Sequence, residues 1–209
     1  MKILIADDHA VVRMGIVSLL REEIMGLQWR ECGSSEEALN LAMEEKFDLV
    51  IADVTMPGRS GLDLLRDLRS CRPNLPVLVV SALAEKEYAV RAFKLGAAGF
   101  ISKESATEVL ISAVRRVLAG GRYVSPALAE DLAGQLGGPA IDAPQAALSN
   151  RELEVLKLVA AGHSLKSIAS KLALSEKTIA TYRARISSKL GLATNVDLTR
   201  FALKQGLID

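Results

Sequence analysis

The chain has 209 residues, enough for one or two domains, and half of them are hydrophobic. This composition excludes a wholly disordered protein, because disordered chains are poor in apolar residues and strongly charged. The 26 Lys+Arg residues nearly balance the 25 Asp+Glu residues, and a net charge of +1 argues against a protein whose whole surface binds nucleic acid or membrane.

Short apolar runs alternate with helical patterns over about the first 120 residues. The expected strands are 2–6, 29–32, 49–52, 77–81 and 99–102. The expected helices are 10–23, 35–45, 61–71, 85–95 and 105–119. Continuous apolar runs in the third and fourth strands are typical of strands that are covered on both faces of a parallel sheet. Five β-α units therefore predict an α/β fold with an open, doubly wound, five-stranded parallel sheet.

A stretch rich in Gly, Pro and Ala, from Gly134 to Ala147, separates this part from the rest. Its Gly-Gly-Pro triplet at 137–139 interrupts helix and strand alike, which predicts a flexible tether. Just before it, Ser125 to Leu132 is expected to form a short helix that Ser125 caps. We therefore expect a first domain over 1–121, a linker over 122–147 and a second domain over 148–209.

The last 62 residues predict an all-α domain of four helices. Ser149-Asn150-Arg151-Glu152 is a capping box that begins the first helix, and Gly162 ends it. The other three are expected over 165–172, 175–190 and 194–205, with caps at Ser175 and Thr194. This domain holds 10 Lys+Arg and 5 Asp+Glu, a net charge of +5, which leaves −4 for the other 147 residues.

The N-terminus and the hydropathy pattern predict a cytoplasmic protein. Residues 1–8 hold one lysine and a short apolar run that acidic residues end, unlike a signal peptide. No stretch reaches the about 18 consecutive apolar residues of a membrane span. Cys32 and Cys71 are far apart and lack metal-ligand spacing, so we expect two buried free thiols, with a disulfide or a redox role as the alternative.

Polar residues stand where expected strands end, at the edge of the sheet where such folds bind ligands: Asp7, Asp8, Asp53, Ser81 and Lys103. Right-handed crossovers place the first and third strands side by side, which brings the three carboxylates together. Such a cluster is unfavourable without a cation, and oxygen ligands with no His or Cys nearby suit Mg²⁺ (or Mn²⁺). Taken singly, each Asp reads as a turn residue and the Lys as a surface residue. Together they predict a phosphoryl site with Asp53 as the nucleophile.

Residues 1 to about 120 resemble a response-regulator receiver domain, which has a flavodoxin-like fold. The matching residues are Asp7-Asp8, Asp53-Val54-Thr55-Met56-Pro57, Gly61, Ser81-Ala82 and Lys103. The resemblance implies that a sensor histidine kinase phosphorylates Asp53. It also implies that Mg²⁺ lies on Asp8, Asp53 and the Thr55 carbonyl, with Asp7 acting mainly through water.

Two further features of the receiver resemblance concern Phe100 and Lys103. In the family, residues at the positions of Ser81 and Phe100 rearrange together when the aspartate carries phosphate; plain core packing is the other interpretation of Phe100. Many receivers follow the lysine with a cis proline, whereas Glu104 follows Lys103 here. Because a non-proline cis bond costs ~3–4 kcal/mol, we expect a trans bond or an altered loop.

The second and third helices of the basic domain, joined by Ala173-Leu174-Ser175, predict a helix-turn-helix over about 167–186. Apolar residues at helical spacing supply its inner face. Small residues on the outer face of the third helix let it enter a major groove while cations reach phosphates. The predicted DNA contacts are Lys177, Thr178, Ala180, Thr181, Arg183, Ala184, Arg185 and Lys189. A basic helix alone is more often a solvated face, so the turn and the local charge carry this prediction.

Residues 148 to 207 resemble the C-terminal domain of the NarL/FixJ (LuxR-type) regulators. The matching segments are 148–156, 161–162, 168–169, 175–179, 189–191 and 202. Together the two resemblances imply a two-component transcriptional regulator that binds double-stranded DNA as a homodimer. Some members place lysines where Ala180 and Ala184 stand, so base readout would rest on Lys177, Thr181 and contact with thymine methyls. Helix 194–205 either supplies the dimer contact or packs within its domain.

Two other functions share the acidic pocket. A phosphatase with an aspartyl-phosphate intermediate uses the same nucleophile and Mg²⁺, but Thr55 stands where its second acid is expected and no cap domain is evident. We therefore expect no dedicated substrate turnover beyond the phosphorylation and dephosphorylation of the receiver itself. The other alternative is a regulator that a protein partner controls in place of phosphate. We also expect the unphosphorylated receiver to mask the recognition helix.

Overall fold

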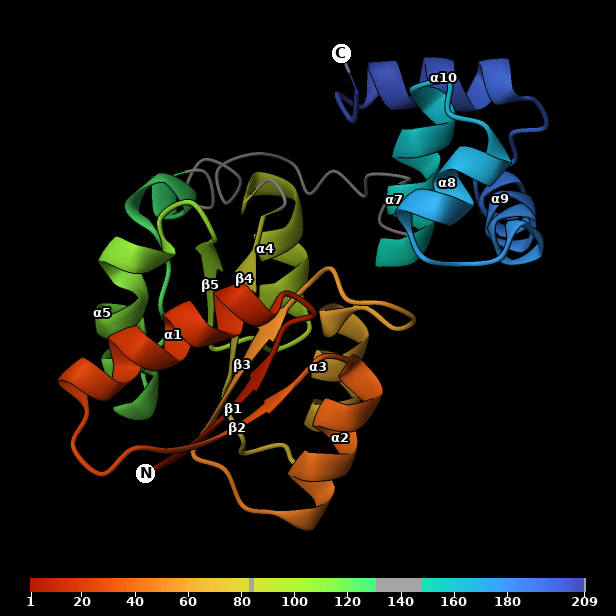
Figure 1. Ribbon diagram of the computed structural model, residues 1–209. Helices are drawn as coiled ribbons and strands as arrows, with labels where there is room; N and C mark the ends of the chain where they lie inside the picture. Colours follow the sequence, from red (N-terminus) through yellow and green to blue (C-terminus); the bar gives the residue numbers. More distant parts are fainter. Residues whose placement is uncertain (83–84, 131–147, 209) are drawn as a thin grey trace. The chain divides into compact units, whose positions relative to one another are not determined.

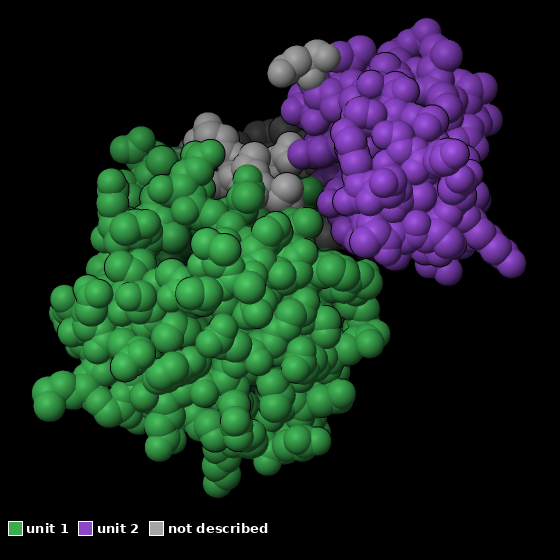
Figure 2. Space-filling view, in the orientation of Figure 1, with its two compact units in different colours: residues 1–139 green, residues 140–209 purple. Residues whose placement is uncertain are grey.

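The computed structural model describes residues 1–82, 85–130 and 148–208. The chain divides into two compact units, residues 1–139 and 140–209, which Figure 2 shows in different colours. The expected short helix is present over 126–130, where Ser125 Oγ accepts a hydrogen bond from the Leu128 N–H at 3.2 Å. Residues 131–132 of the expected helix and the tether at 134–147 lie outside the described residues.

Unit 1 contains the predicted parallel sheet, with strand order β2-β1-β3-β4-β5. The strands are β1 (Lys2–Ala6), β2 (Gln28–Cys32), β3 (Leu49–Asp53), β4 (Val77–Ser81) and β5 (Gly99–Ser102). β3 runs one residue further than expected, because Asp53 still pairs with Val80 in β4. β1 lies between β2 and β3, so the predicted neighbourhood of the first and third strands is confirmed.

Five helices cover the two faces of this sheet (Figure 1). α1 (Ala10–Glu23) and α5 (Ala106–Leu118) lie on one face. α2 (Ser35–Glu44), α3 (Gly61–Cys71) and α4 (Glu85–Lys94) lie on the other. Because helices cover both faces, all five residues of β3 and of β4 are buried, and all but the last residues, Asp53 and Ser81, are apolar.

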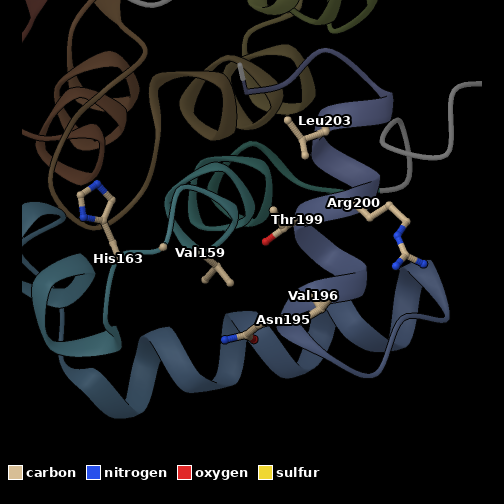
Figure 3. A pocket seen from close by; sticks show the side chains of 8 residues that line it. Val159, His163, Asn195, Val196, Thr199, Arg200 and Leu203 are labelled. Carbon is tan, nitrogen blue, oxygen red and sulfur yellow. The ribbon is translucent and has the colours of Figure 1, made fainter.

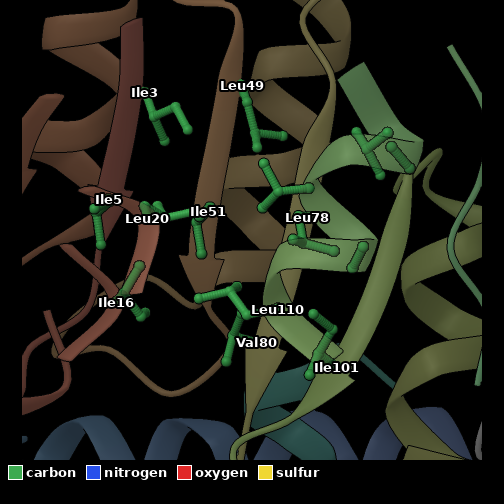
Figure 4. Close-up of a cluster of buried hydrophobic side chains, with 14 of the residues drawn as sticks. Ile3, Ile5, Ile16, Leu20, Leu49, Ile51, Leu78, Val80, Ile101 and Leu110 are labelled. Carbon is green, nitrogen blue, oxygen red and sulfur yellow. The ribbon is translucent and has the colours of Figure 1, made fainter. Parts of the chain in front are cut away.

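A hydrophobic core lies between the sheet and α1 and α5 (Figure 4). Alternate strand residues point into it, because successive side chains in a strand point to opposite faces. The strand residues on this side are Ile3, Ile5, Leu49, Ile51, Leu78, Val80 and Ile101. Phe100, next to Ile101 in β5, is fully buried but does not belong to this cluster. The alternation therefore directs Phe100 toward the opposite face of the sheet.

The described part of unit 2 is helical, with α7 (Asn150–Ala160), α8 (Leu165–Lys171), α9 (Glu176–Leu190) and α10 (Asn195–Lys204). The expected caps are confirmed: the hydroxyls of Ser149, Ser175 and Thr194 each accept a hydrogen bond from the backbone N–H three residues later. Ser164 caps α8 in the same way, which was not expected. These caps satisfy backbone donors that a helix N-terminus leaves without intrahelical partners.

The two cysteines differ in their surroundings. Both thiols are free, as expected, and Cys32 is buried; burial raises the pKa of the Cys32 thiol to about 12. The expectation of a buried Cys71 is wrong, because Cys71 is the last residue of α3 and is exposed. Among the described residues, no helix combines the length and apolar character needed to cross a membrane.

Candidate functional site

Lys103 holds two buried carboxylates together at the carboxyl edge of the sheet. Asp7 follows β1 and Asp53 ends β3, and both side chains are only 2% exposed. The Lys103 Nζ lies 2.7 Å from Asp7 Oδ2 and 2.8 Å from Asp53 Oδ2. The structure thus brings together residues from the ends of three strands that are far apart in the sequence.

Burial and pairing act against each other in this pocket. Burial raises the pKa of Asp53, the Lys103 ammonium lowers it, and the net shift is upward from 3.8. Burial lowers the pKa of Lys103, but its ion pairs with Asp53 and Asp7 outweigh burial, so that pKa lies above its ordinary value of 10.5. Asp53 therefore carries a more basic carboxylate than a solvated aspartate, beside a lysine that stays protonated.

Asp8 and His9 complete the cluster. Oxygen and nitrogen atoms of Asp7, Asp8, His9 and Asp53 lie within 4.8 Å of one another. The His9 Nδ1 is 2.7 Å from Asp8 Oδ1 and 3.2 Å from Asp7 Oδ1. The expectation that no His accompanies these carboxylates is wrong. His9, the N-cap residue of α1, places its ring nitrogen beside Asp7 and Asp8.

The residues around Asp53 fit a divalent cation. Asp53 Oδ1 is buried and makes no hydrogen bond, although the Thr55 backbone N–H is near enough to lower the pKa of Asp53 slightly. A buried carboxylate oxygen without a partner costs free energy that a cation offsets. Three carboxylates near one another also form the oxygen-rich donor set that Mg²⁺ and Mn²⁺ accept.

Gly61 is required by the backbone of Asp53. The first turn of α3 approaches the end of β3 so closely that a Cβ on Gly61 would lie 1.8 Å from the Asp53 carbonyl oxygen. The Gly61 N–H also donates to the Val54 carbonyl at 3.0 Å. The glycine of the receiver motif therefore permits a close backbone approach that holds Asp53 in place.

The other predicted pocket residues lie on or next to β3, β4 and β5. Ser81 ends β4 and is fully buried, and its carbonyl accepts the Lys103 N–H at 2.8 Å. Phe100 is fully buried in β5. Thr55 is half-buried, two residues beyond the end of β3. The Lys103–Glu104 bond is trans, as expected.

α8 and α9 form the predicted helix-turn-helix. Ala173 in the turn has a φ of 51°, in the left-handed region that non-glycine residues rarely adopt. Arg151 of α7, itself 6% exposed, fixes the turn by donating from Nη2 to the Leu172 carbonyl at 3.0 Å. Ile179 and Ile186 of α9 are fully buried, which confirms the predicted inner face at these positions.

The predicted DNA contacts lie on the remaining surface of α9. The exposed ones are Lys177, Ala180, Thr181, Ala184, Arg185 and Lys189, and Thr178 and Arg183 are half-buried. A shallow hollow of about 280 Å³ in the surface of α9 is lined by Ser175, Lys177, Thr178, Thr181, Tyr182 and Arg185. Tyr182, which is not among the predicted contacts, also lines this hollow. It lies four residues after Thr178 and three before Arg185, so the three side chains share one side of α9.

Two of the predicted DNA contacts also hold unit 2 together. The Lys189 Nζ lies 2.6 Å from Oε2 of Glu152, the residue that closes the capping box of α7. The Arg183 Nε donates to Asn195 Oδ1 of α10 at 2.8 Å. Lys177 and Arg185 are both exposed on α9, so they are the better candidates for phosphate contact.

α10 has one buried and one exposed apolar side. Leu198 and Ala202 are fully buried, and the Thr199 hydroxyl donates to the Ala160 carbonyl of α7 at 3.3 Å. Val196 and Leu203 are 66% and 50% exposed. They border an open hollow of about 440 Å³ that α7 and α10 form (Figure 3). The predicted packing of this helix within its domain is therefore present, and a second apolar surface remains exposed.

Comparison with known proteins identifies both units. The family model of the response regulator receiver domain matches residues 3–115, and that of the bacterial regulatory proteins of the luxR family matches residues 146–202. The chain is 41% identical to the response regulator GacA of Pseudomonas aeruginosa, over 100% of this chain and 98% of that protein. It is 33% identical to the response regulator UvrY of Escherichia coli, over 98% of this chain and 94% of that protein.

A solved structure extends this agreement to the fold. RcsB of Salmonella enterica serovar Typhimurium, bound to the promoter rprA in the presence of phosphomimetic BeF3−, matches with a TM-score of 0.62 and 27% identity. The match covers 96% of this chain and 98% of that one. Both predicted resemblances are thus confirmed. The chain belongs to the response regulators of two-component systems, with an N-terminal receiver domain and a C-terminal DNA-binding domain of the luxR family.

Proposed function

We propose that Asp53 accepts a phosphoryl group from a sensor histidine kinase and that this controls binding of the C-terminal domain to DNA. The observation that carries the proposal is that the two carboxylate oxygens of Asp53 differ in their hydrogen bonding. Lys103 holds Oδ2 at 2.8 Å, whereas Oδ1 is buried without a hydrogen bond. In the transfer, an Asp53 oxygen attacks phosphorus, the bond from phosphorus to the kinase imidazole breaks, and an acyl phosphate forms.

The other pocket residues have separate roles in binding the cation and in stabilising the phosphoryl group. Asp7, Asp8, Asp53 and the Thr55 carbonyl would hold Mg²⁺ or Mn²⁺, which offsets charge on the transferred group when bound. Lys103 keeps its proton and faces Asp53, so it neutralises charge that develops on the phosphoryl oxygens. Ser81 then donates its hydroxyl to a phosphoryl oxygen, and Phe100 moves into the space that Ser81 leaves.

Mass spectrometry tests the phosphoacceptor. After incubation with acetyl phosphate and Mg²⁺, the wild type should gain about 80 Da, the mass of a phosphoryl group, and Asp53→Asn should gain nothing. Asp48→Asn is the matched control, because Asp48 stands at the other end of β3. An unmodified wild type, or the same adduct in Asp53→Asn, contradicts the proposal.

We further propose that α9 is the recognition helix, with contacts from Lys177, Thr178, Ala180, Thr181, Arg183, Ala184, Arg185 and Lys189. The exposed cations and the small residues between them support entry into a major groove. On a mixed-sequence duplex, Lys177→Ala and Arg185→Ala should each weaken binding and reduce the slope of affinity against salt by about 1. Lys204→Ala, an equal loss of charge on α10, should leave that slope unchanged. Equal slopes in all variants mean that another surface binds DNA.

We also propose that the protein binds DNA as a homodimer through the exposed side of α10. Val196 and Leu203 support this, because exposed apolar residues one above the other on a helix suit a partner surface. In sedimentation velocity on DNA-bound protein, Leu203→Glu should reduce the dimer. Met43→Glu, at an equally exposed methionine of α2, should not. Dimers that persist in Leu203→Glu contradict the assignment.

The remaining assignments follow from these partners. We propose a cytoplasmic location, because the DNA partner lies there, and no substrate turnover apart from chemistry at Asp53. We retain 1–121 as the receiver, 122–147 as the linker and 148–209 as the DNA-binding domain. We also propose that phosphorylation of Asp53 raises the affinity of the protein for DNA.

A further inference from the structure

We propose that His9 is a ligand of the cation in the acidic pocket and shifts its selectivity from Mg²⁺ toward divalent transition metals such as Mn²⁺ and Ni²⁺. The inference rests on the proposed cation site and adds a nitrogen donor to it. The His9 Nδ1 is 2.7 Å from Asp8 Oδ1 and 3.2 Å from Asp7 Oδ1. The His9 ring nitrogen therefore contacts the carboxylates of both Asp7 and Asp8.

These separations are those of neighbouring ligands on one ion. Octahedral ligands at about 2.1 Å from a metal stand about 3 Å from each other. The distances from His9 Nδ1 to Asp8 Oδ1 and Asp7 Oδ1 lie on either side of that value. An ion that Asp8 and Asp7 hold through these oxygens is thus within reach of the imidazole without a large movement.

The backbone sets the ring in this position. His9 is the N-cap of α1, with φ −90° and ψ 104°, and its side chain makes no capping hydrogen bond. Its backbone N–H donates to Asp7 Oδ1 at 2.8 Å, which fixes the backbone of His9 beside that carboxylate. The ring is consequently directed to the pocket and is not used to stabilise the helix.

Lys103 and His9 occupy different sides of the carboxylates. Lys103 contacts Oδ2 of Asp7 and Oδ2 of Asp53. The other oxygens are Asp7 Oδ1, which His9 contacts, and Asp53 Oδ1, which is buried without a partner. The His9 side chain is 63% exposed, so it can adjust to an ion with little cost in packing. A cation bound to Asp7 Oδ1 and Asp53 Oδ1 would therefore lie close to the His9 imidazole, whereas Lys103 contacts the Oδ2 atoms.

An imidazole nitrogen changes which ions a carboxylate site prefers. Mg²⁺ favours oxygen ligands, whereas imidazole suits transition metals, whose affinity for a given site rises from Mn²⁺ to Ni²⁺. Replacing His9 by a residue without an imidazole should therefore weaken binding of all three ions unequally. The loss should be smallest for Mg²⁺, larger for Mn²⁺ and largest for Ni²⁺.

Calorimetric titration of the full chain with each ion tests this order. In His9→Asn, the factor by which Ni²⁺ affinity falls should exceed the factor for Mg²⁺ by about tenfold. His163→Asn is the matched control, because His163 is the other of the two histidines in the chain and belongs to unit 2. It should bind all three ions like the wild type. Equal factors for Mg²⁺ and Ni²⁺ in His9→Asn overturn the proposal.

Pulsed electron paramagnetic resonance of bound Mn²⁺ provides a direct signature of the ligand. A ¹⁴N modulation from a coordinated imidazole should appear in the wild type and in His163→Asn and be absent in His9→Asn. Mn²⁺ bound without this modulation in the wild type overturns the role of His9. In that case, phosphorylation by acetyl phosphate with Mg²⁺ still proceeds if Asp53 is the phosphoacceptor, so failure of the two proposals is distinguishable.

Discussion

The acidic pocket of the receiver and the predicted DNA-contacting face of α9 expose their charged groups to water to very different degrees. In unit 1, Asp7 and Asp53 are 2% exposed, and Lys103 joins them from a third strand. In unit 2, Lys177 and Arg185 lie on the open face of α9, whose apolar residues point inward. A buried ionic site costs stability and depends on every partner, whereas an exposed one depends on the helix that carries it. Substitutions of the pocket residues should therefore change the stability of unit 1 more than substitutions on the face of α9 change that of unit 2.

The largest effect is expected where the pocket is held by backbone. Gly61→Ala should destabilise unit 1 by about 3 kcal/mol or more, because a Cβ at 1.8 Å from the Asp53 carbonyl oxygen displaces β3 or α3. Urea denaturation followed by fluorescence of Trp29, the single tryptophan, reports on unit 1. The control Gly15→Ala, a helical position with open space, should instead stabilise the unit by up to about 1 kcal/mol. Similar stabilities of the two variants contradict the close approach.

The next largest effect tests the cost of the buried charges. Without added divalent cation, Lys103→Met should destabilise unit 1 by about 3 kcal/mol, since it leaves two buried carboxylates without a counter-charge. Adding Asp53→Asn to this variant should recover part of the loss. Lys46→Met, at an exposed lysine of the same unit, should change stability by less than about 0.5 kcal/mol. If Lys103→Met and Lys46→Met change the free energy of unfolding equally, the buried carboxylates do not depend on Lys103 for their stability.

A smaller effect is expected in unit 2, at Glu152. Burial raises the pKa of this carboxyl, but hydrogen bonds from Lys189 and Ser149 outweigh burial and hold the pKa below 4.5. Glu152→Gln should cost about 1–2 kcal/mol at neutral pH, while Glu176→Gln on the surface should cost little. Because the folded pKa is lowered, this contribution is complete above the unfolded pKa and is lost as the pH falls through the folded pKa. Calorimetry at several pH values checks it, and a pH-independent difference contradicts the pairing.

The smallest effect concerns the turn before the recognition helix. Ala173→Gly should stabilise unit 2 by about 0.5–1 kcal/mol, because the left-handed φ of 51° strains alanine and not glycine. Ala180→Gly in the middle of α9 should destabilise it by about 1 kcal/mol. Circular dichroism during thermal unfolding measures both. If Ala173→Gly destabilises unit 2 as much as Ala180→Gly does, the backbone of Ala173 is not strained.

The sheet and most of the pocket were predictable from the sequence. Buried parallel strands are continuous apolar runs, and a polar residue directly after such a run must lie at the carboxyl edge of the sheet. Asp53 and Lys103, for example, are separated by fifty residues, yet strand order alone brings them together. Helix caps were predictable for a similar reason, since each depends on a hydroxyl and a backbone group three residues apart.

Contacts that depend on docking or on one side-chain torsion were not predictable. The ring of His9 reaches the carboxylates because of the N-cap conformation of that residue, which no sequence pattern specifies. The contact from Lys189 to Glu152 depends on how α9 packs on α7, and that from Arg183 to Asn195 on how it meets α10. The exposure of Cys71 likewise follows from which side of α3 packs on the sheet.

The unequal cysteines have a practical consequence for spectroscopy. With its pKa near 12 and its thiol buried, Cys32 is a poor target for thiol reagents at neutral pH, whereas Cys71 is exposed. Cys71 ends the helix that Gly61 begins, so a fluorophore or spin label attached there sits about 15 Å along α3 from the phosphoacceptor strand. The unmodified sequence therefore already provides one selective labelling position on the receiver.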